Sequence, residues 1–161
     1  MRIDHKLLTV LSRQDVDRLL DSTGDLKYKA MLATMYSSVL RVSEVIHLHY
    51  EDVSRTNMQI HVRESKSRMD RYTILSRRNL DLLTEYWFQC GRPRDILFPN
   101  KFTGGYLTVS TLEQVMRRSV RDAELPAGAT PHSLRHPNVK PKTQNNCCLY
   151  VREKGNKQKQ Y

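Results

Sequence analysis

Cationic side chains beside a single imidazole are the groups in this 161-residue sequence that could do chemistry. His132 and Arg135 stand three residues apart in the segment TPHSLRH, residues 130–136. A threonine at the N-cap followed by proline at the first helical position is a helix-start signal. The segment therefore predicts a helix from Pro131, with His132 and Arg135 on one face of its first turn, near the positive end of the helix dipole. Such a pair suits an anion, and a purely structural capping role is the alternative.

Two further cations occupy positions that are ordinary when each is taken alone. Arg41 lies in the segment LRVSE, at the predicted junction of two helices and beside a predicted cap at Ser43. An arginine at such a place is more often a surface or cap-network residue than a functional one. Lys66 lies in a polar hairpin loop, where lysines are common because they protect strand edges from further pairing. Neither residue carries a function by itself.

Several familiar kinds of site find no support in the sequence. It contains no GxxxxGK[ST] loop for nucleotides, no HExxH, no paired CxxC and no EF-hand loop. The carboxylates Asp52, Asp70 and Asp81 lack a spacing that indicates a two-metal nuclease. The three cysteines, two of them adjacent, cannot build a disulfide scaffold or a zinc site. We therefore expect no metal ion, no cofactor and a reduced, cytoplasmic environment.

The elements that must position these cations are mainly helical. Alternation of apolar and polar residues predicts two strands, at residues 58–63 and 71–75, and the polar segment between them predicts a hairpin loop that carries Lys66. Caps and helical spacing predict helices after Ser12, over residues 27–49 with a second short helix opening at Ser43, after Ser76, and from Ser110 to Ala123. The predicted fold class is α+β, mainly α, with a small antiparallel β-sheet. Pro137 falls in the second turn of the last predicted helix and is expected to stop or kink it, at a cost of about 3 kcal/mol.

Charge and hydropathy limit the function classes. A net charge of +10 and a pI near 9.7 predict attraction to polyanions, of which nucleic acid is the commonest. The mean hydropathy of −0.64 and the lack of a long apolar run exclude a membrane-spanning helix and a signal peptide. Residues 137–161 hold six Lys and Arg against Glu153 alone, a net charge of +5. Few apolar residues lie in this segment, so we expect residues 1–136 to form one globular domain and residues 137–161 to form a disordered basic tail.

The segments YSSVLRVSEV, IHVRESKSRMDRYTIL, ILFP and TPHSLRH occur in this order between about Leu11 and His136. In that order and on those elements they resemble the tyrosine recombinase, or phage integrase, family. The resemblance implies a mainly helical catalytic domain with a small antiparallel sheet. It also implies site-specific cleavage and rejoining of double-stranded DNA through a 3′-phosphotyrosine, without a metal ion, by copies that assemble on the DNA.

The resemblance also implies roles for four residues. Arg41 matches the first catalytic arginine of the family, Lys66 the hairpin lysine, His132 the histidine of HxxR and Arg135 its arginine. Two guanidinium groups can hold the non-bridging oxygens of a phosphate whose negative charge grows in the transition state. The lysine would protonate the 5′-oxygen leaving group, and the histidine would bind the phosphate or transfer the proton of the nucleophile.

The chain departs from the family pattern beyond Arg135. The family continues with a Gly-His motif and the nucleophilic tyrosine, whereas this tail contains no Gly-His pair. Tyr150 and Tyr161 are weak candidates for the nucleophile because both lie closer to Arg135 than the family tyrosine does. We therefore expect residues 137–161 to replace the last helices of the family, through a frameshift or degeneration. An N-terminal DNA-clamping domain is also expected to be absent, and the chain to be inactive or dependent on a partner. The alternative is a non-catalytic DNA-binding remnant of such an integrase.

Overall fold

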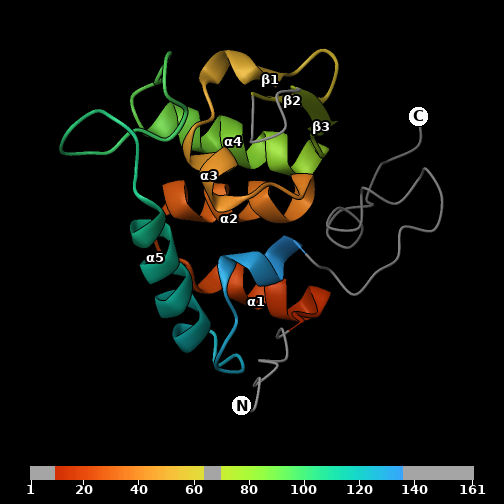
Figure 1. Cartoon of the computed structure of the whole chain (residues 1–161), viewed down its shortest axis with the longest axis vertical. Helices are drawn as coiled ribbons and strands as arrows, with labels where there is room; N and C mark the ends of the chain where they lie inside the picture. Colours follow the sequence, from red (N-terminus) through yellow and green to blue (C-terminus); the bar gives the residue numbers. More distant parts are fainter. Residues whose placement is uncertain (1–9, 64–69, 136–161) are drawn as a thin grey trace, which may run out of the picture.

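Helices dominate the computed structural model, which describes residues 10–63 and 70–135 (Figure 1). A small sheet lies at one end of the helical body, so the structure confirms the predicted α+β, mainly α, fold class. Among the described helices, none is long and apolar enough to cross a membrane. The elements are α1 (Arg13–Ser22), α2 (Leu26–Ser38), α3 (Val42–Ile46), η1 (Tyr50–Asp52), β1 (Val53–Ser54), β2 (Gln59–Val62), β3 (Arg71–Ile74), α4 (Arg77–Gln89), α5 (Val109–Asp122) and η2 (Pro131–Arg135), where η marks a 3-10 helix.

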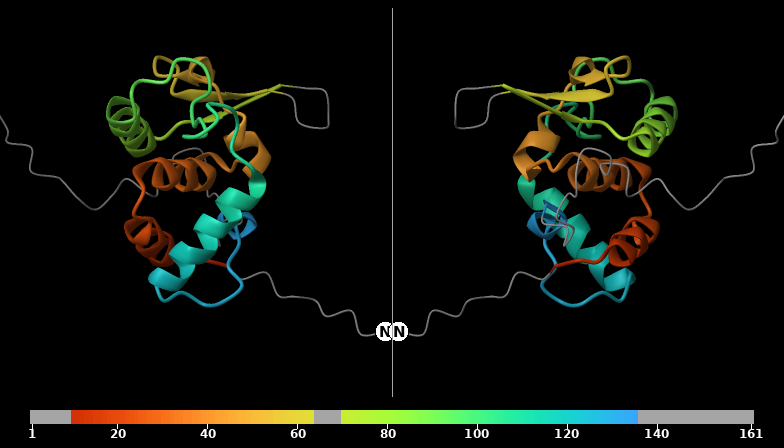
Figure 2. Two further views of the ribbon diagram at one scale, coloured as in Figure 1. Left: turned by 90° about the vertical axis from the view of Figure 1, so that its left-hand side faces the viewer. Right: turned by 90° about the vertical axis from the view of Figure 1, so that its right-hand side faces the viewer.

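Helix α2 is the centre of the molecule. Six consecutive residues, 30–35, are buried on all of its sides, as expected for a helix that other elements surround. Figure 2 shows α4 and the sheet above α2, α1 below it, and α5 crossing beside them. Because α2 also contacts α3 and η2, the two segments that carry Arg41 and Arg135 are packed against the same helix.

Helix starts follow the predicted caps in two cases and depart from them in others. Ser12 and Asp15 form the capping box of α1, and the hydrogen bonds from Ser12 lower the pKa of the Asp15 carboxyl. Ser76 caps α4 by accepting a hydrogen bond from the backbone N–H of Asn79. The predicted cap at Ser110 is wrong, because Thr108 accepts the N–H of residue 111 and is the N-cap of α5, two residues earlier.

The predicted helical stretch over residues 27–49 is two helices with a turn between them. Helix α2 ends at Ser38, and Val39 takes the left-handed conformation with φ 54° and ψ 43°. The chain then turns back to extended geometry at Arg41, which is the N-cap of α3, so the predicted cap at Ser43 is wrong. This turn decides the direction in which Arg41 leaves the body.

The sheet has the order β1-β2-β3 with antiparallel pairs. Strands β2 and β3 match the two predicted strands, and Val62 pairs with Arg71 at the end nearest the hairpin. Strand β1 was not predicted, because two residues are too few to show an alternating pattern. Ile60 and Val62 are buried, so the sheet lies with one face on the helical body.

The predicted α-helix from Pro131 is instead a 3-10 helix of five residues. Its N–H at Ser133 donates to the carbonyl of Thr130, three residues back, which is the 3-10 pattern. The cap also differs from the prediction, because the hydroxyl of Ser133 accepts the N–H of Thr130. The proposed break at Pro137, the domain boundary after His136 and the basic tail lie outside the described residues.

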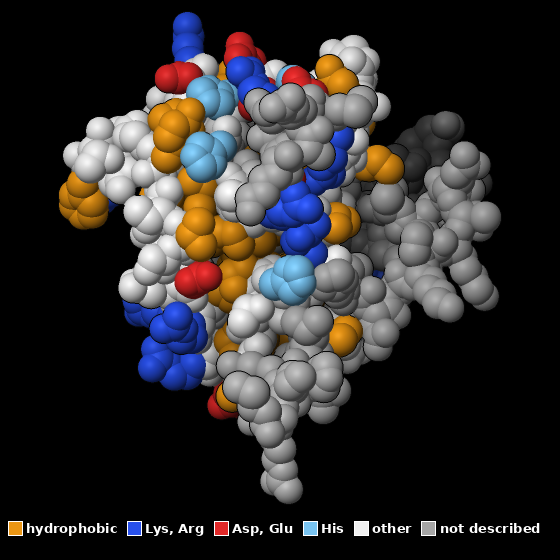
Figure 3. Space-filling view, in the orientation of Figure 1, with side chains coloured by type: hydrophobic (Ala, Val, Ile, Leu, Met, Phe, Trp, Pro, Cys, Tyr) orange, Lys and Arg blue, Asp and Glu red, His pale blue; other side chains and the backbone are white. Residues whose placement is uncertain are grey.

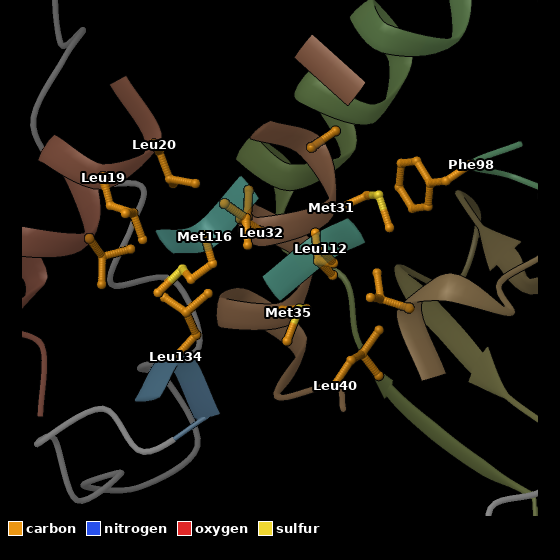
Figure 4. Close-up of a cluster of buried hydrophobic side chains, with 14 of the residues drawn as sticks. Leu19, Leu20, Met31, Leu32, Met35, Leu40, Phe98, Leu112, Met116 and Leu134 are labelled. Carbon is orange, nitrogen blue, oxygen red and sulfur yellow. The ribbon is translucent and has the colours of Figure 1, made fainter. Parts of the chain in front are cut away.

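One buried cluster holds the site segments to the body (Figure 4). Leu134 of η2 is fully buried and points toward Met116 of α5. Leu40, next to Arg41, is fully buried as well. Arg41 and Arg135 therefore each directly follow a fully buried leucine, which restricts the positions that their side chains can reach.

Candidate active site

Arg41 begins the site at the start of α3. Its backbone N–H donates to Glu44 Oε2 at 2.7 Å, so the glutamate side chain closes the first turn of the helix. The guanidinium of Arg41 lies 3.6 Å from Glu44 Oε1, Nη1 to oxygen, and its side chain is half exposed. This is an ion pair longer than a good hydrogen bond. Arg41 is thus tethered through its backbone while half of its side chain remains accessible.

Glu44 is a buried carboxylate at the centre of the site. Its side chain is only 3% exposed. Oε2 accepts a second hydrogen bond, at 2.9 Å, from Nη2 of Arg71, the first residue of β3. A buried carboxylate is stable only when charged partners and hydrogen bonds compensate it. Arg41 and Arg71 together supply that compensation.

Arg135 is the third arginine of the site and comes from η2. Burial, followed by the charge of Arg41, lowers the pKa of its guanidinium. Arg71 acts in the same direction, and the negative charge of Glu44 acts against it. Its Nε–H is buried and donates to no acceptor among the described residues. A buried donor without an acceptor is costly, so an anion at Arg135 would stabilise the site.

The net charge of the site favours an anion. Three guanidinium groups surround one carboxylate, which leaves a charge of +2. Figure 3 shows Lys and Arg side chains gathered near the middle of one face of the molecule, with a His side chain beside them. A site of this charge complements a phosphodiester and complements still better a phosphorane, which carries more negative charge.

His132 is exposed on η2, three residues before Arg135. Side chains at positions i and i+3 of a 3-10 helix eclipse each other. His132 and Arg135 are therefore expected on one face of η2 even though η2 is a 3-10 helix and not the predicted α-helix. Thr130 and Ser133 hold the turn by reciprocal hydrogen bonds, which orients both side chains.

The structure brings together only part of the predicted set. Arg41 and Arg135 lie close enough for their charges to interact. His132 lies on η2, three residues before Arg135. Lys66 lies outside the described residues, as do Tyr150 and Tyr161. The segment that contains Lys66 joins Arg63 to Asp70, directly before Arg71.

Sequence reasoning missed two residues of the site. Glu44 carried a signal, because an acidic residue three positions after a helix N-cap is typical of a capping box. Arg71 carried none, since alternation in a strand indicates two faces but not what the other elements bring to them. In the part of the chain that the structure describes, no group of three or more His, Cys, Asp and Glu side chains could hold a metal ion.

Comparison with known proteins gives one family. The model described as "Phage integrase family" matches residues 9–138. A putative integrase/recombinase, y4qK of Sinorhizobium fredii, is 36% identical over 131 residues, which are 81% of this chain and 42% of that protein. Tyrosine recombinase XerC of Halalkalibacterium halodurans is 31% identical over 147 residues, covering 81% of this chain and 48% of the relative. The chain spans about half the length of the curated relatives that it matches.

Solved structures give the same fold. The crystal structure of XerA recombinase matches with a TM-score of 0.71 and 26% identity, over 84% of this chain and 49% of that one. XerH site-specific recombinase bound to its difH substrate matches with a TM-score of 0.69 and 21% identity, over 85% of this chain and 44% of that one. The arrangement of α2, α3, the small sheet and η2 is therefore one that solved recombinases also have.

Proposed function

Because the chain belongs to the phage integrase family, we propose that it acts on double-stranded DNA as a site-specific recombinase, cleaving and rejoining strands through a 3′-phosphotyrosine. The cluster of Arg41, Arg71 and Arg135 around the buried Glu44 is the observation that carries this proposal. Its net positive charge and the unpartnered Nε of Arg135, among the described residues, leave a place for a phosphate group.

In the proposed reaction, Arg41 and Arg135 bind the non-bridging oxygens of the scissile phosphate. A tyrosine oxygen attacks phosphorus, a bond to the 3′-side phosphate forms, and the bond to the 5′-oxygen breaks. The two guanidinium groups stabilise the charge that develops on the equatorial oxygens. A bound phosphate also offsets the burial and the repulsion by Arg41 that lower the pKa of Arg135.

Lys66 is proposed to protonate the departing 5′-oxygen. Its support is indirect: Arg71, five residues farther along, contacts Glu44, so the strand that follows the Lys66 loop starts at the phosphate site. His132 is proposed to bind the same phosphate or to accept the proton of the tyrosine. Tyr150 and Tyr161 remain the candidate nucleophiles in this chain, and the catalytic unit is proposed to end near His136.

A second group of cations supports DNA as the partner. Arg117, Arg118 and Arg121 of α5 are among the residues that line a cavity of about 760 Å³, together with residues 127–129. Figure 3 shows Lys and Arg side chains over the lower part of α5, on the same face as the central group. A DNA duplex carries phosphates at regular short intervals, so a duplex bound at the central site has further phosphates to offer this helix.

The test is capture of a covalent adduct. The full chain is incubated with a library of nicked duplexes whose sequence is randomised around the nick, so that the short 5′ fragment diffuses away after cleavage. Adducts that survive denaturant are isolated and sequenced. We expect adducts with wild type and none with Arg41→Ala or Arg135→Ala. Tyr161→Phe and Tyr150→Phe then identify the nucleophile.

A non-catalytic DNA-binding protein is the second candidate, and the exposed arginines of α5, away from the phosphate site, favour it. No adduct from the library, together with equal DNA affinity of wild type and the Arg41→Ala/Arg135→Ala variant, would establish this alternative. In that case the recombinase proposal is wrong for this chain.

A further inference from the structure

Arg71 is a third guanidinium in the site, brought there by the sheet. It opens β3 and pairs with Val62 of β2. Its side chain is 44% exposed, yet its Nη2 lies 2.9 Å from the buried Oε2 of Glu44, 27 residues earlier in the chain. The contact joins the sheet to the helix that carries Arg41.

The geometry of Glu44 shows what this contact does for Arg41. Oε2 is shared between the N–H of Arg41 and the guanidinium of Arg71, whereas Oε1 accepts no hydrogen bond from the described residues and lies 3.6 Å from Arg41 Nη1. With Arg71 in place, Oε2 accepts two hydrogen bonds, and the Arg41 guanidinium is held to the carboxylate only by the longer ion pair to Oε1. Without Arg71, a carboxylate that is 3% exposed would need the Arg41 guanidinium as its principal partner.

The net charge of the cluster also depends on Arg71. With Arg71 the cluster carries +2, and without it +1, since Glu44 would then offset one of two remaining arginines. Arg71 also acts on Arg135 through space, in the same sense as Arg41 does. The electrostatic potential at the anion site therefore depends on Arg71 as well as on Arg41 and Arg135, the two arginines that would bind the anion.

We propose that Arg71 is a positioning residue of the phosphate site: by holding Glu44 it keeps the guanidinium of Arg41 directed toward the phosphate. The inference rests on the proposed function only in that it takes the anion to be a phosphate of DNA. It assigns to this arginine a role that acts through Glu44, and it requires no cleavage to be observed.

The experiment measures inorganic phosphate at the site itself. The full chain is labelled with ¹⁵N-arginine, and the side-chain Nε–H signals of Arg41 and Arg135 are followed as phosphate is added. Arg71→Gln is expected to weaken phosphate binding about tenfold, the effect of removing one charge-assisted interaction. Arg71→Lys retains the charge and should weaken binding less. Arg77→Gln on α4, which removes an arginine that is 74% exposed and paired with Asp81, is the matched control and should change nothing.

Two readouts separate positioning from a general loss of structure. Before phosphate is added, Arg71→Gln should shift the Arg41 Nε–H signal, because that guanidinium turns to Glu44. Adding Glu44→Gln to Arg71→Gln should restore most of the phosphate affinity, which a purely structural defect would not allow.

The proposal is overturned if Arg71→Gln binds phosphate within twofold of wild type, if the double variant recovers nothing while Arg71→Lys behaves like Arg71→Gln, or if wild type binds no phosphate at Arg135. Failure of the recombinase proposal looks different, since covalent adducts would be missing while the phosphate affinities still followed Arg71.

Discussion

Single residues at the site are restrained by backbone geometry as much as by charge. Arg41 is directed by its position as an N-cap, and the turn before it depends on Val39. A left-handed conformation is unfavourable for a β-branched residue, because Cβ approaches the carbonyl oxygen. Val39 is 43% exposed, so packing does little to compensate this strain. The approach to the site therefore contains a strained residue.

At this scale, Val39→Gly is expected to stabilise the protein by about 1 kcal/mol. Glycine removes a left-handed cost of about 1–2 kcal/mol, and its greater freedom in the unfolded chain cancels part of the gain. Urea unfolding of the full chain measures the change. Val39→Ala keeps a Cβ and should gain less than half as much. Equal gains from glycine and alanine would mean that strain at φ 54° is not the cause.

At the scale of elements, the sheet is joined to η1 by a second buried carboxylate. Asp52 is 3% exposed; it accepts the N–H of His49 at 2.9 Å and Nε–H of Arg63 at 2.7 Å, and it lies 3.5 Å from Nδ1 of His61. Hydrogen bonds to Glu51 and Asp52 raise the pKa of Arg63. The end of β2 is thus held to η1 before the chain enters the Lys66 segment.

Asp52→Asn is expected to cost about 2 kcal/mol of unfolding free energy, because a buried network is deprived of its charge while its donors remain. Glu51→Gln is the matched control: Glu51 also contacts Arg63, but it is 69% exposed, and exposed ion pairs contribute little. Thermal or urea unfolding of both variants is compared with wild type. Equal losses of stability in the two variants would contradict a special role of the buried carboxylate.

For the whole molecule, the positions of the charges matter more than their total. Lys and Arg side chains near the centre of the molecule and over the lower part of α5 are visible on one face (Figure 3), whereas Figure 2 places α4 on the opposite side from α3 and η2. A duplex bound to the first face should be insensitive to arginines on α4. This arrangement makes the proposed DNA surface testable without knowledge of the target sequence.

The salt dependence of DNA binding tests this surface. For Arg117→Gln/Arg121→Gln, the slope of log K against log salt for a duplex of arbitrary sequence should fall by about 2 in magnitude, because two phosphates are no longer neutralised. Arg77→Gln/Arg78→Gln removes the same charge from α4 and should leave the slope as in wild type. Fluorescence anisotropy at several salt concentrations provides both values. A reduced slope in the α4 variant, with an unchanged slope in the α5 variant, would place the DNA on the other side.

Interactions between residues close in the chain explain which elements of the fold could be predicted from the sequence. Capping by Ser12 and Ser76, the alternation in β2 and β3 and the helical spacing of α2 involve residues close in the chain, so their patterns predicted the elements. Boundaries were harder to predict, because Val39 ends α2 in a conformation that valine rarely adopts. The Thr-Pro start predicted a helix at η2 but not its 3-10 form, and Ser133, not Thr130, supplies the side-chain acceptor of the turn.

The sequence by itself determined the types of side chain available for chemistry, and the order of its motifs allowed Arg41, Lys66, His132 and Arg135 to be selected. Only the tertiary structure decided that Glu44 lies between the arginines and that β3 adds Arg71 to them. The physical reason is that capping and periodicity depend on neighbours a few residues away. A compensated buried charge, by contrast, depends on which distant elements pack together when α2 is enclosed.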